Sequence, residues 1–195
     1  MTTDTLSMQD ARRVYFEENR FGPDGGYGDT WVKVMVGPLP FWFPNTSSRV
    51  RAVRFHDLHH ILTGYRTDFP GETEISAWEL ATGCADHGAA WVLNLAGMGA
   101  GLYFQPRAVF RAFVRGRHSQ NLYRRTFDDA LLKQPVASLR RELGLDAPAP
   151  KATFADVATF AGFVLASLAT AFVAGGVSLA PVAAVAIGLW RLLLG

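Results

Sequence analysis

Three of the chain's five histidines lie within residues 54–72, a run that also holds several carboxylates. His56 and His60 are four residues apart, so they share one face of a helix, and Asp57 lies beside the same stripe. A turn rich in glycine and proline then leads to Glu72. Imidazoles and carboxylates gathered in this way suit a divalent metal such as zinc, iron or manganese. The alternative is a solvated, polar helix end that happens to hold histidines.

Three better-known histidine motifs do not fit this run. The zincin pattern His-Glu-x-x-His needs a glutamate after the first histidine, and here that residue is Asp57. The phosphohydrolase His-Asp pair needs another histidine upstream, and none precedes His56. Membrane desaturases and hydroxylases need several histidine boxes, and the remaining His87 and His118 are isolated.

What remains is His-Asp-x-x-His, eleven residues, and then Glu, a pattern that resembles the Coq4 family of ubiquinone-biosynthesis proteins. The resemblance extends to Leu62-Thr63-Gly64 after the second histidine, to Gly71 directly before Glu72, and to Glu79 seven residues further on. It spans about residues 22–145 and is specific only around the motif.

The resemblance implies an all-helical fold and one divalent metal, usually zinc, held by His56, Asp57, His60 and Glu72. Two histidines with carboxylates also suit iron or manganese. Glu79 is two turns beyond Glu72 and lies on the same helical face. We therefore expect Glu79 to hold a ligand imidazole by its other ring nitrogen, the alternative being an exposed acid.

The resemblance also implies a function in ubiquinone biosynthesis. That function is the metal-dependent removal of the C1 carboxyl group from a polyprenylated 4-hydroxybenzoate-type ring, in some accounts coupled to hydroxylation. The alternative is a non-catalytic scaffold that binds such lipids and presents them to other ubiquinone-biosynthesis enzymes. Arg54, or a neighbouring arginine, is available for a substrate anion, and a homodimer stays open.

Caps, prolines and glycines predict an all-α domain over residues 1–145. Residues 38–44 are rich in proline and are predicted to be extended, with Phe41, Trp42 and Phe43 expected in the core, the alternative being contact with lipid. The expected helices cover residues 7–20 and 31–36, begin near Asn45, Asp68 and Pro106, and end with short helices at 126–133 and 135–143.

Two features of the second half of this domain suit a lipid substrate. Ala89, Gly97 and Gly101 are small enough to leave room for a polyprenyl tail, or else they only let helices pack closely. The helix that begins at Pro106 alternates arginines with apolar residues, which is typical of a helix on a membrane surface or against a partner; these arginines are Arg107, Arg111, Arg115 and Arg117.

The C-terminal part differs in composition. Residues 146–151 read as a linker, and residues 152–195 contain two apolar runs, 157–174 and 177–194, separated by Gly175-Gly176. We expect a two-helix transmembrane hairpin with both ends in the cytoplasm, the alternative being a helical pair packed on a partner protein.

The composition narrows the class further. The net charge of +2 is too small, and too little organised into a basic patch, to indicate nucleic-acid binding. Cys84 is the only cysteine, so a disulfide framework and a zinc ribbon are excluded. The N-terminus resembles neither a signal peptide nor a transit peptide, so we expect a bacterial inner-membrane protein whose main domain is cytoplasmic.

Overall fold

The computed structural model describes residues 3–36 and 39–173 of the chain, and this part is mostly helical, as predicted. A long apolar helix, Phe154–Val173, follows the numbered elements. Those elements are, in chain order, η1 (Thr3–Thr5), α1 (Met8–Asn19), β1 (Trp31–Val36), β2 (Leu39–Pro44), α2 (Ser47–Thr63), α3 (Phe69–Thr82), α4 (Gly88–Phe104), α5 (Pro106–Arg117), α6 (Asp129–Leu132) and α7 (Val136–Glu142).

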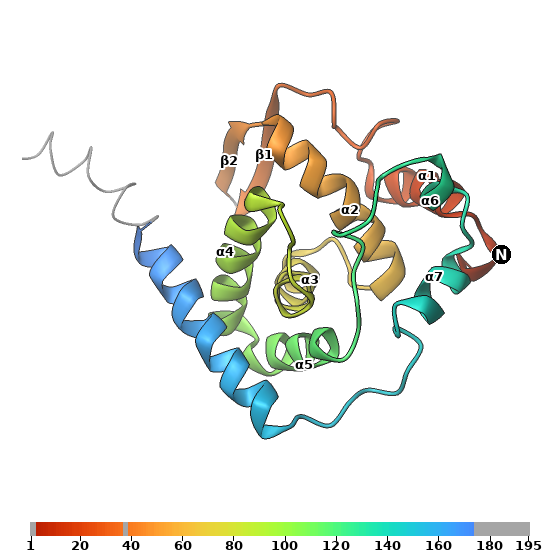
Figure 1. Ribbon diagram of the computed structural model, residues 1–195. Coiled ribbons are helices and arrows are strands. Elements are labelled where there is room, and N and C mark those ends of the chain that lie inside the picture. Colours follow the sequence, from red (N-terminus) through yellow and green to blue (C-terminus); the bar gives the residue numbers. More distant parts are fainter. Residues whose placement is uncertain (1–2, 37–38, 174–195) are drawn as a thin grey trace, which may run out of the picture.

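Helix α3 is the centre of the fold. Figure 1 shows it nearly end-on, with α2, α4 and α5 arranged around it. Its sequence is apolar on more than one face, and Ile75, Trp78 and Leu80 are all buried. A helix that is apolar all round is stable only when other elements cover it. The inward-facing polar side chains of α3, Thr73, Ser76 and Glu79, are therefore enclosed by the surrounding helices.

Two glycines let α4 approach α3 closely. A Cβ atom added at Gly97 would lie 2.3 Å from the Ser76 hydroxyl oxygen, and one added at Gly101 would lie 2.6 Å from Cβ of Thr73. Such contacts are far too short for real side chains, so both positions require glycine. The expected groove for a polyprenyl tail at these two residues is therefore wrong, because α3 fills the space.

The ends of the two helices that carry the motif follow from their sequences. The Thr46 hydroxyl accepts a hydrogen bond from Arg49 N–H and begins α2, while Gly64, with φ of 77°, ends it. The Asp68 carboxylate accepts a hydrogen bond from Gly71 N–H and begins α3. The loop between α2 and α3 is thus closed at both ends by local signals.

One predicted helix is wrong, because residues 31–36 form strand β1, which pairs antiparallel with β2. β-Branched residues occupy every second position of β1, namely Val32, Val34 and Val36, and the proline-rich β2 can pair only as an extended partner. Trp42 of β2 is 59% exposed, so its expected place in the core is also wrong.

The apolar helix Phe154–Val173 lies along α4 and α5 (Figure 1). Phe160 packs edge-on against Phe113, and Phe163 stacks with Trp91. This helix is long and apolar enough to cross a membrane and covers most of the first predicted apolar run. The second run, and with it the hairpin, lies outside the described residues.

Candidate metal centre

Three potential metal ligands converge between α2 and the start of α3. His56 Nε2 lies 3.1 Å from His60 Nε2. The two carboxylate oxygens of Glu72 divide between them, one 3.3 Å from His56 Nε2 and the other 3.3 Å from His60 Nε2. The structure therefore brings together three of the four predicted ligands, although His56 and Glu72 are 16 positions apart in the sequence.

The spacing of these three donor atoms suits a metal ion. Zinc–nitrogen bonds of about 2.0–2.1 Å in a tetrahedral arrangement put two ligand atoms about 3.3–3.4 Å apart. Bonds of similar length at right angles, as in an octahedral site, put them about 3.0 Å apart. The observed separations of 3.1 and 3.3 Å lie between these values. The donor set thus fits a divalent ion and leaves its identity open.

His60 is oriented by the end of its own helix. Its Nδ1–H donates to the carbonyl oxygen of Tyr65 at 2.9 Å, just past the left-handed turn at Gly64. This leaves Nε2 as the nitrogen with a free lone pair, which is the form that a metal ligand needs. Arg115 of α5 donates to the Thr63 carbonyl at 2.9 Å and thereby fixes the same turn.

His56 is oriented by Glu79, which lies two turns after Glu72 on α3. The His56 Nδ1–H donates to Glu79 Oε1 at 2.9 Å, so its Nε2 also faces the other two donors. Three further groups donate to the Glu79 carboxylate, which is completely buried; they are His59 Nδ1–H at 2.7 Å, Asn94 Nδ2–H at 2.6 Å and Tyr123 O–H at 2.7 Å.

This network decides the protonation of the site. Burial disfavours the charged form of Glu79, but His56 and His59 outweigh it and hold the pKa of Glu79 well below its usual value. Burial likewise opposes a charged His56, yet Glu79 and Glu72 raise its pKa well above the usual value. His59 differs, because burial lowers its pKa and its Nε2 accepts a hydrogen bond from the Leu122 N–H. It is therefore a neutral support for Glu79.

Glu72 is the most accessible of the three donors. Its side chain is 42% exposed, against 19% for His56 and 1% for His60. Partial burial opposes its ionisation, but the two neighbouring histidines favour the charged carboxylate and lower the pKa of Glu72 to about 2. The centre thus opens to the surface on the Glu72 side and presents an anionic ligand there at neutral pH.

Gly71 explains how the chain returns from α2 to place Glu72. A Cβ atom at this position would lie 2.0 Å from the carbonyl oxygen of Arg66. No side chain fits there, so the first turn of α3 packs directly against the loop backbone. This close approach sets the position of Glu72, the next residue in the chain.

Asp57 does not belong to the group of converging donors. Its buried carboxylate accepts hydrogen bonds from Tyr27 O–H at 2.6 Å and, at 3.5 Å, from Tyr15 O–H. Tyr15 in turn stacks on the His60 ring, with the ring centroids 5.9 Å apart. Burial raises the pKa of Asp57, although the Tyr27 hydrogen bond opposes this shift. A direct bond from Asp57 to the metal stays a prediction.

Arg54 also lies away from the converging donors. Its guanidinium group lies over the rings of Tyr27 and Phe127, 5.5 and 5.7 Å from their centroids. It borders a separate cavity, which none of the three donor residues lines. A contact between Arg54 and a substrate at the metal centre stays a prediction.

Sequence reasoning missed several residues that support the centre. His59 is next to His60 in the motif and lies beside the His56/His60 stripe, on the side away from Asp57. This position could have indicated a second contact with Glu79. Asn94 and Tyr123 come from α4 and from the segment after α5, and nothing in their local sequence points to Glu79. Only the packing of α2 and α4 around α3 brings them there.

Comparison of this chain with models of protein families, with curated proteins and with solved structures finds no match. The relation to the Coq4 family thus rests on the sequence motif around the metal centre and is carried forward as a proposal.

Proposed function

We propose that this protein is a membrane-associated, metal-dependent enzyme of the Coq4 type. In this proposal it removes the C1 carboxyl group of a polyprenylated 4-hydroxybenzoate-type lipid during ubiquinone biosynthesis. The observation that carries the proposal is a centre with three protein donors, His56, His60 and Glu72, whose accessible side lies next to an exposed apolar surface.

The number of donors favours catalysis over a purely structural metal. Structural zinc sites usually have four protein ligands, whereas catalytic sites have three and keep a position for water or substrate. Here Asp57, the fourth predicted ligand, is engaged with Tyr27 and Tyr15. Two histidines with one carboxylate are also the donor set of several iron enzymes and zinc hydrolases, so the set alone does not select a reaction.

The surroundings of Glu72 favour an apolar substrate. Phe69 is one turn before Glu72 on the same helical face, and its ring packs edge-on against Phe104 with centroids 5.3 Å apart. Both rings are exposed, Phe69 to 41% and Phe104 to 66%. A lipid whose ring reaches the metal centre would thus find aromatic contacts at its mouth.

These rings continue into a larger surface that we call the apolar flank. It comprises the exposed apolar residues of α4 and of the helix Phe154–Val173 beside it. Exposed apolar surface of this extent is usually covered by a membrane or a partner. The residues of the apolar flank are Val92, Leu93, Tyr103, Phe104, Phe154, Val157, Leu165, Leu168, Phe172 and Val173.

The basic helix α5 also suits a membrane surface, although fewer of its arginines are available for lipid head groups than its sequence suggests. Arg115 is used inside the protein at the end of α2, and Arg117 pairs with Asp156. Arg107 and Arg111 are exposed and, within the described residues, have no ion-pair partner. They lie three and seven residues after Phe104, and such a neighbourhood of aromatic and basic residues is typical of a membrane–water interface.

The proposed reaction breaks the bond between the ring carbon C1 and its carboxylate carbon. Carbon dioxide leaves, the bonding electron pair stays on C1, and C1 takes up a proton. A bound divalent metal supplies Lewis-acid stabilisation of the negative charge that develops on the substrate. The chain's own residues hold this centre in place: Glu79 and the Tyr65 carbonyl orient the imidazoles. The buried Asp57, whose pKa is raised by burial, is a carboxyl group near His60 that can hold a proton.

A scaffold without catalysis is the second candidate. The apolar flank favours it, because an exposed apolar surface is enough to bind a lipid and no metal is needed for that. The two candidates differ in what Glu72 does. In the enzyme this residue is essential for turnover, whereas in the scaffold it is dispensable for lipid binding.

The test compares lipids that copurify with three forms of the full chain, expressed in a bacterium that makes ubiquinone. The forms are wild type, Glu72→Gln and the control Glu74→Gln. Glu74 is on the same helix and has no hydrogen bond or ion pair among the described residues. Mass spectrometry should find a carboxylated polyprenyl ring accumulating with Glu72→Gln only. Equal unmodified lipid in all three, with normal quinone synthesis, would support the scaffold; no prenylated ring in any form would contradict both candidates.

A further inference from the structure

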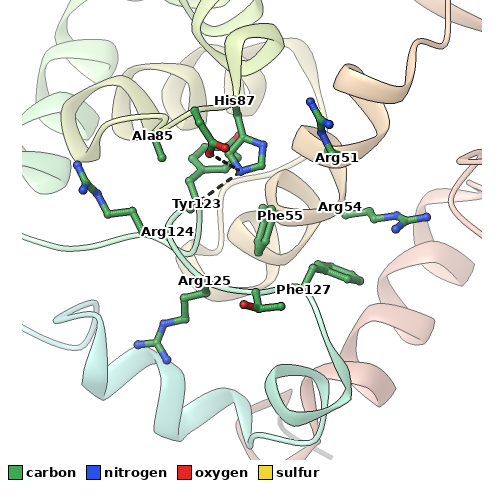
Figure 2. Close-up of a pocket in the computed structure, with 11 residues that line it drawn as sticks. Arg51, Arg54, Phe55, Ala85, His87, Tyr123, Arg124, Arg125 and Phe127 are labelled. Atoms are coloured by element: carbon green, nitrogen blue, oxygen red, sulfur yellow. Dashed lines mark hydrogen bonds and ion pairs between the residues drawn. The ribbon is translucent and has the colours of Figure 1, made fainter.

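The cavity that Arg54 borders, of about 830 Å³, is separate from the metal centre. It lies between α2, the turn from α3 to α4 and the segment that follows α5. Figure 2 shows this cavity, with aromatic side chains at its floor and arginines around it. Its volume is in the range of pockets that bind small molecules and cofactors. It touches the support of the metal centre at one point, since Tyr123 of its floor donates to Glu79.

The floor is a cluster of aromatic rings centred on Phe55. Phe127 and His87 both pack edge-on against Phe55, each with a centroid separation of 5.4 Å, and Tyr123 does so at 6.0 Å. Phe55 and Tyr123 are buried in the core, whereas Phe127 is half-buried and offers ring surface to the cavity. The wall at Ala85 has a left-handed backbone, with φ of 46°, an uncommon conformation for a residue other than glycine.

The rim carries an excess of positive charge that the protein does not neutralise. Four arginines and one acid line the cavity, so the lining has a net charge of +3. Arg125 is paired with Glu142, and Asp86 is almost fully exposed at the edge. Among the described residues, Arg51 and Arg124 have no hydrogen bond or ion pair, and Arg54 has only ring contacts.

The place of Arg51 and Arg54 strengthens this point. Both are on α2, a helix whose first turn holds no acid, so that turn offers neither arginine an acidic partner. An anion at the rim would supply one. Figure 2 shows the arginine side chains on several sides of the floor, with the charged ends of Arg54, Arg124 and Arg125 pointing outward, so a bound anion would have to draw the unpaired arginines inward.

We propose that this cavity binds an aromatic phosphate, such as a nucleoside phosphate. The ring would lie on the floor at Phe127, and the phosphate charges would meet Arg51, Arg124 and the free edge of Arg54. The pair between Arg125 and Glu142 leaves +2 of the lining's +3 charge uncompensated, so an aromatic monocarboxylate, with one negative charge, is too weak a match, whereas phosphate groups bring two or more and accept bidentate hydrogen bonds from arginine. This site does not depend on the metal or on the proposed reaction.

Isothermal titration of the full chain in neutral detergent with ATP, inorganic triphosphate, adenosine and phenyl phosphate tests the proposal. We expect ATP to bind with a dissociation constant below 1 mM, more tightly than triphosphate or adenosine. Stronger binding of ATP than of phenyl phosphate would identify a nucleotide site, and the reverse order a site for simpler aryl phosphates. Equal binding of ATP and triphosphate would contradict the role of the aromatic floor.

Two matched variants locate the binding. Arg51→Ala/Arg124→Ala removes two rim charges, and Arg107→Ala/Arg111→Ala removes two exposed charges of α5. The first should weaken ATP binding at least tenfold and the second less than twofold, with wild-type metal content in both as the check on folding. Binding should also persist in His60→Ala, which removes a metal ligand. Equal loss in the two double variants, loss in His60→Ala, or no binding of any probe below 1 mM would overturn the proposal.

Discussion

The metal centre and the apolar flank are built on opposite principles. At the metal centre every imidazole nitrogen that faces away from the three converging donors has a hydrogen-bond partner, and the supporting carboxylate of Glu79 accepts four hydrogen bonds. The apolar flank has no such partners and consists of side chains left uncovered by the protein. Hydrogen bonds within the protein therefore fix the metal centre, whereas the apolar flank depends on contact with a membrane or a partner outside the protein.

The difference predicts where single changes act. A change at the metal centre disturbs a defined set of contacts and should be felt as lost metal or lost stability. A change on the apolar flank breaks no side-chain hydrogen bond among the described residues and should be felt mainly in the partition of the protein between membrane and water.

The largest effect is expected when a ligand imidazole is removed. His60→Ala deletes a donor whose Nε2 lies within 3.3 Å of both other donors, so bound metal should fall from about one equivalent to almost none. Elemental analysis of protein purified without a histidine tag measures this. His118→Ala, which changes a histidine outside the centre, should keep its metal; stoichiometric metal in both variants would rule out this ligand.

The apolar flank should respond to charge without any change at the metal centre. Leu165 and Leu168 are exposed on the helix Phe154–Val173, and a lysine near the middle of a bilayer costs about 2.5–3.5 kcal/mol. Leu165→Lys/Leu168→Lys should therefore move the protein into the soluble fraction on carbonate extraction, with its metal retained.

Gln9→Lys/Ala130→Lys is the control for that experiment, since it adds the same charge at two exposed positions of α1 and α6. It should leave the protein in the membrane fraction. If both double variants, or neither, leave the membrane, the helix Phe154–Val173 is not what attaches the protein.

Glu79→Gln tests the network behind the metal centre. The amide has one oxygen and one NH2 group, so either His56 and His59 or Asn94 and Tyr123 face an N–H group, and at least one buried donor loses its acceptor. We expect the free energy of unfolding to fall by about 3 kcal/mol and metal affinity by about 10- to 100-fold. Urea unfolding and a metal competition titration measure the two losses; unchanged metal affinity would show that Glu79 does not position His56.

Gly71→Ala should weaken the centre without touching a ligand. The added methyl group would collide with the Arg66 carbonyl, so the start of α3 must shift, at a cost of about 1–3 kcal/mol. Metal affinity should fall as Glu72 moves. At Gly88 an added Cβ meets nothing within 4 Å, and Gly88→Ala should change stability by less than about 0.5 kcal/mol. If Gly71→Ala and Gly88→Ala have the same stability and the same metal affinity, the close packing at Gly71 does not set the position of Glu72.

Local signals in the sequence were enough for the helices of the centre. The spacing of His56 and His60 placed both rings on one face of α2, and Thr46, Gly64 and Asp68 act as the caps that their types predict. These features could be read because each depends on residues within a few positions of one another.

Features that depend on contacts between residues far apart in the sequence could not be predicted in this way. Asp57 has the residue type and spacing of a ligand, but two tyrosines from earlier in the chain hold its carboxylate. Asp29 and Thr30, residue types that cap helices, directly precede residues 31–36, yet pairing with the extended β2 decides the structure of this segment. Asn94 and Tyr123 reach Glu79 only through the packing of whole helices.

X-ray absorption at the metal edge of the full chain, purified without a tag, identifies the atoms that bind the metal. We expect two imidazole nitrogens and at least one carboxylate oxygen at about 2.0–2.2 Å, with at least one of these contributions lost in Glu72→Gln. Bound metal without imidazole scattering, or a spectrum identical in wild type and Glu72→Gln, would contradict a centre formed by His56, His60 and Glu72.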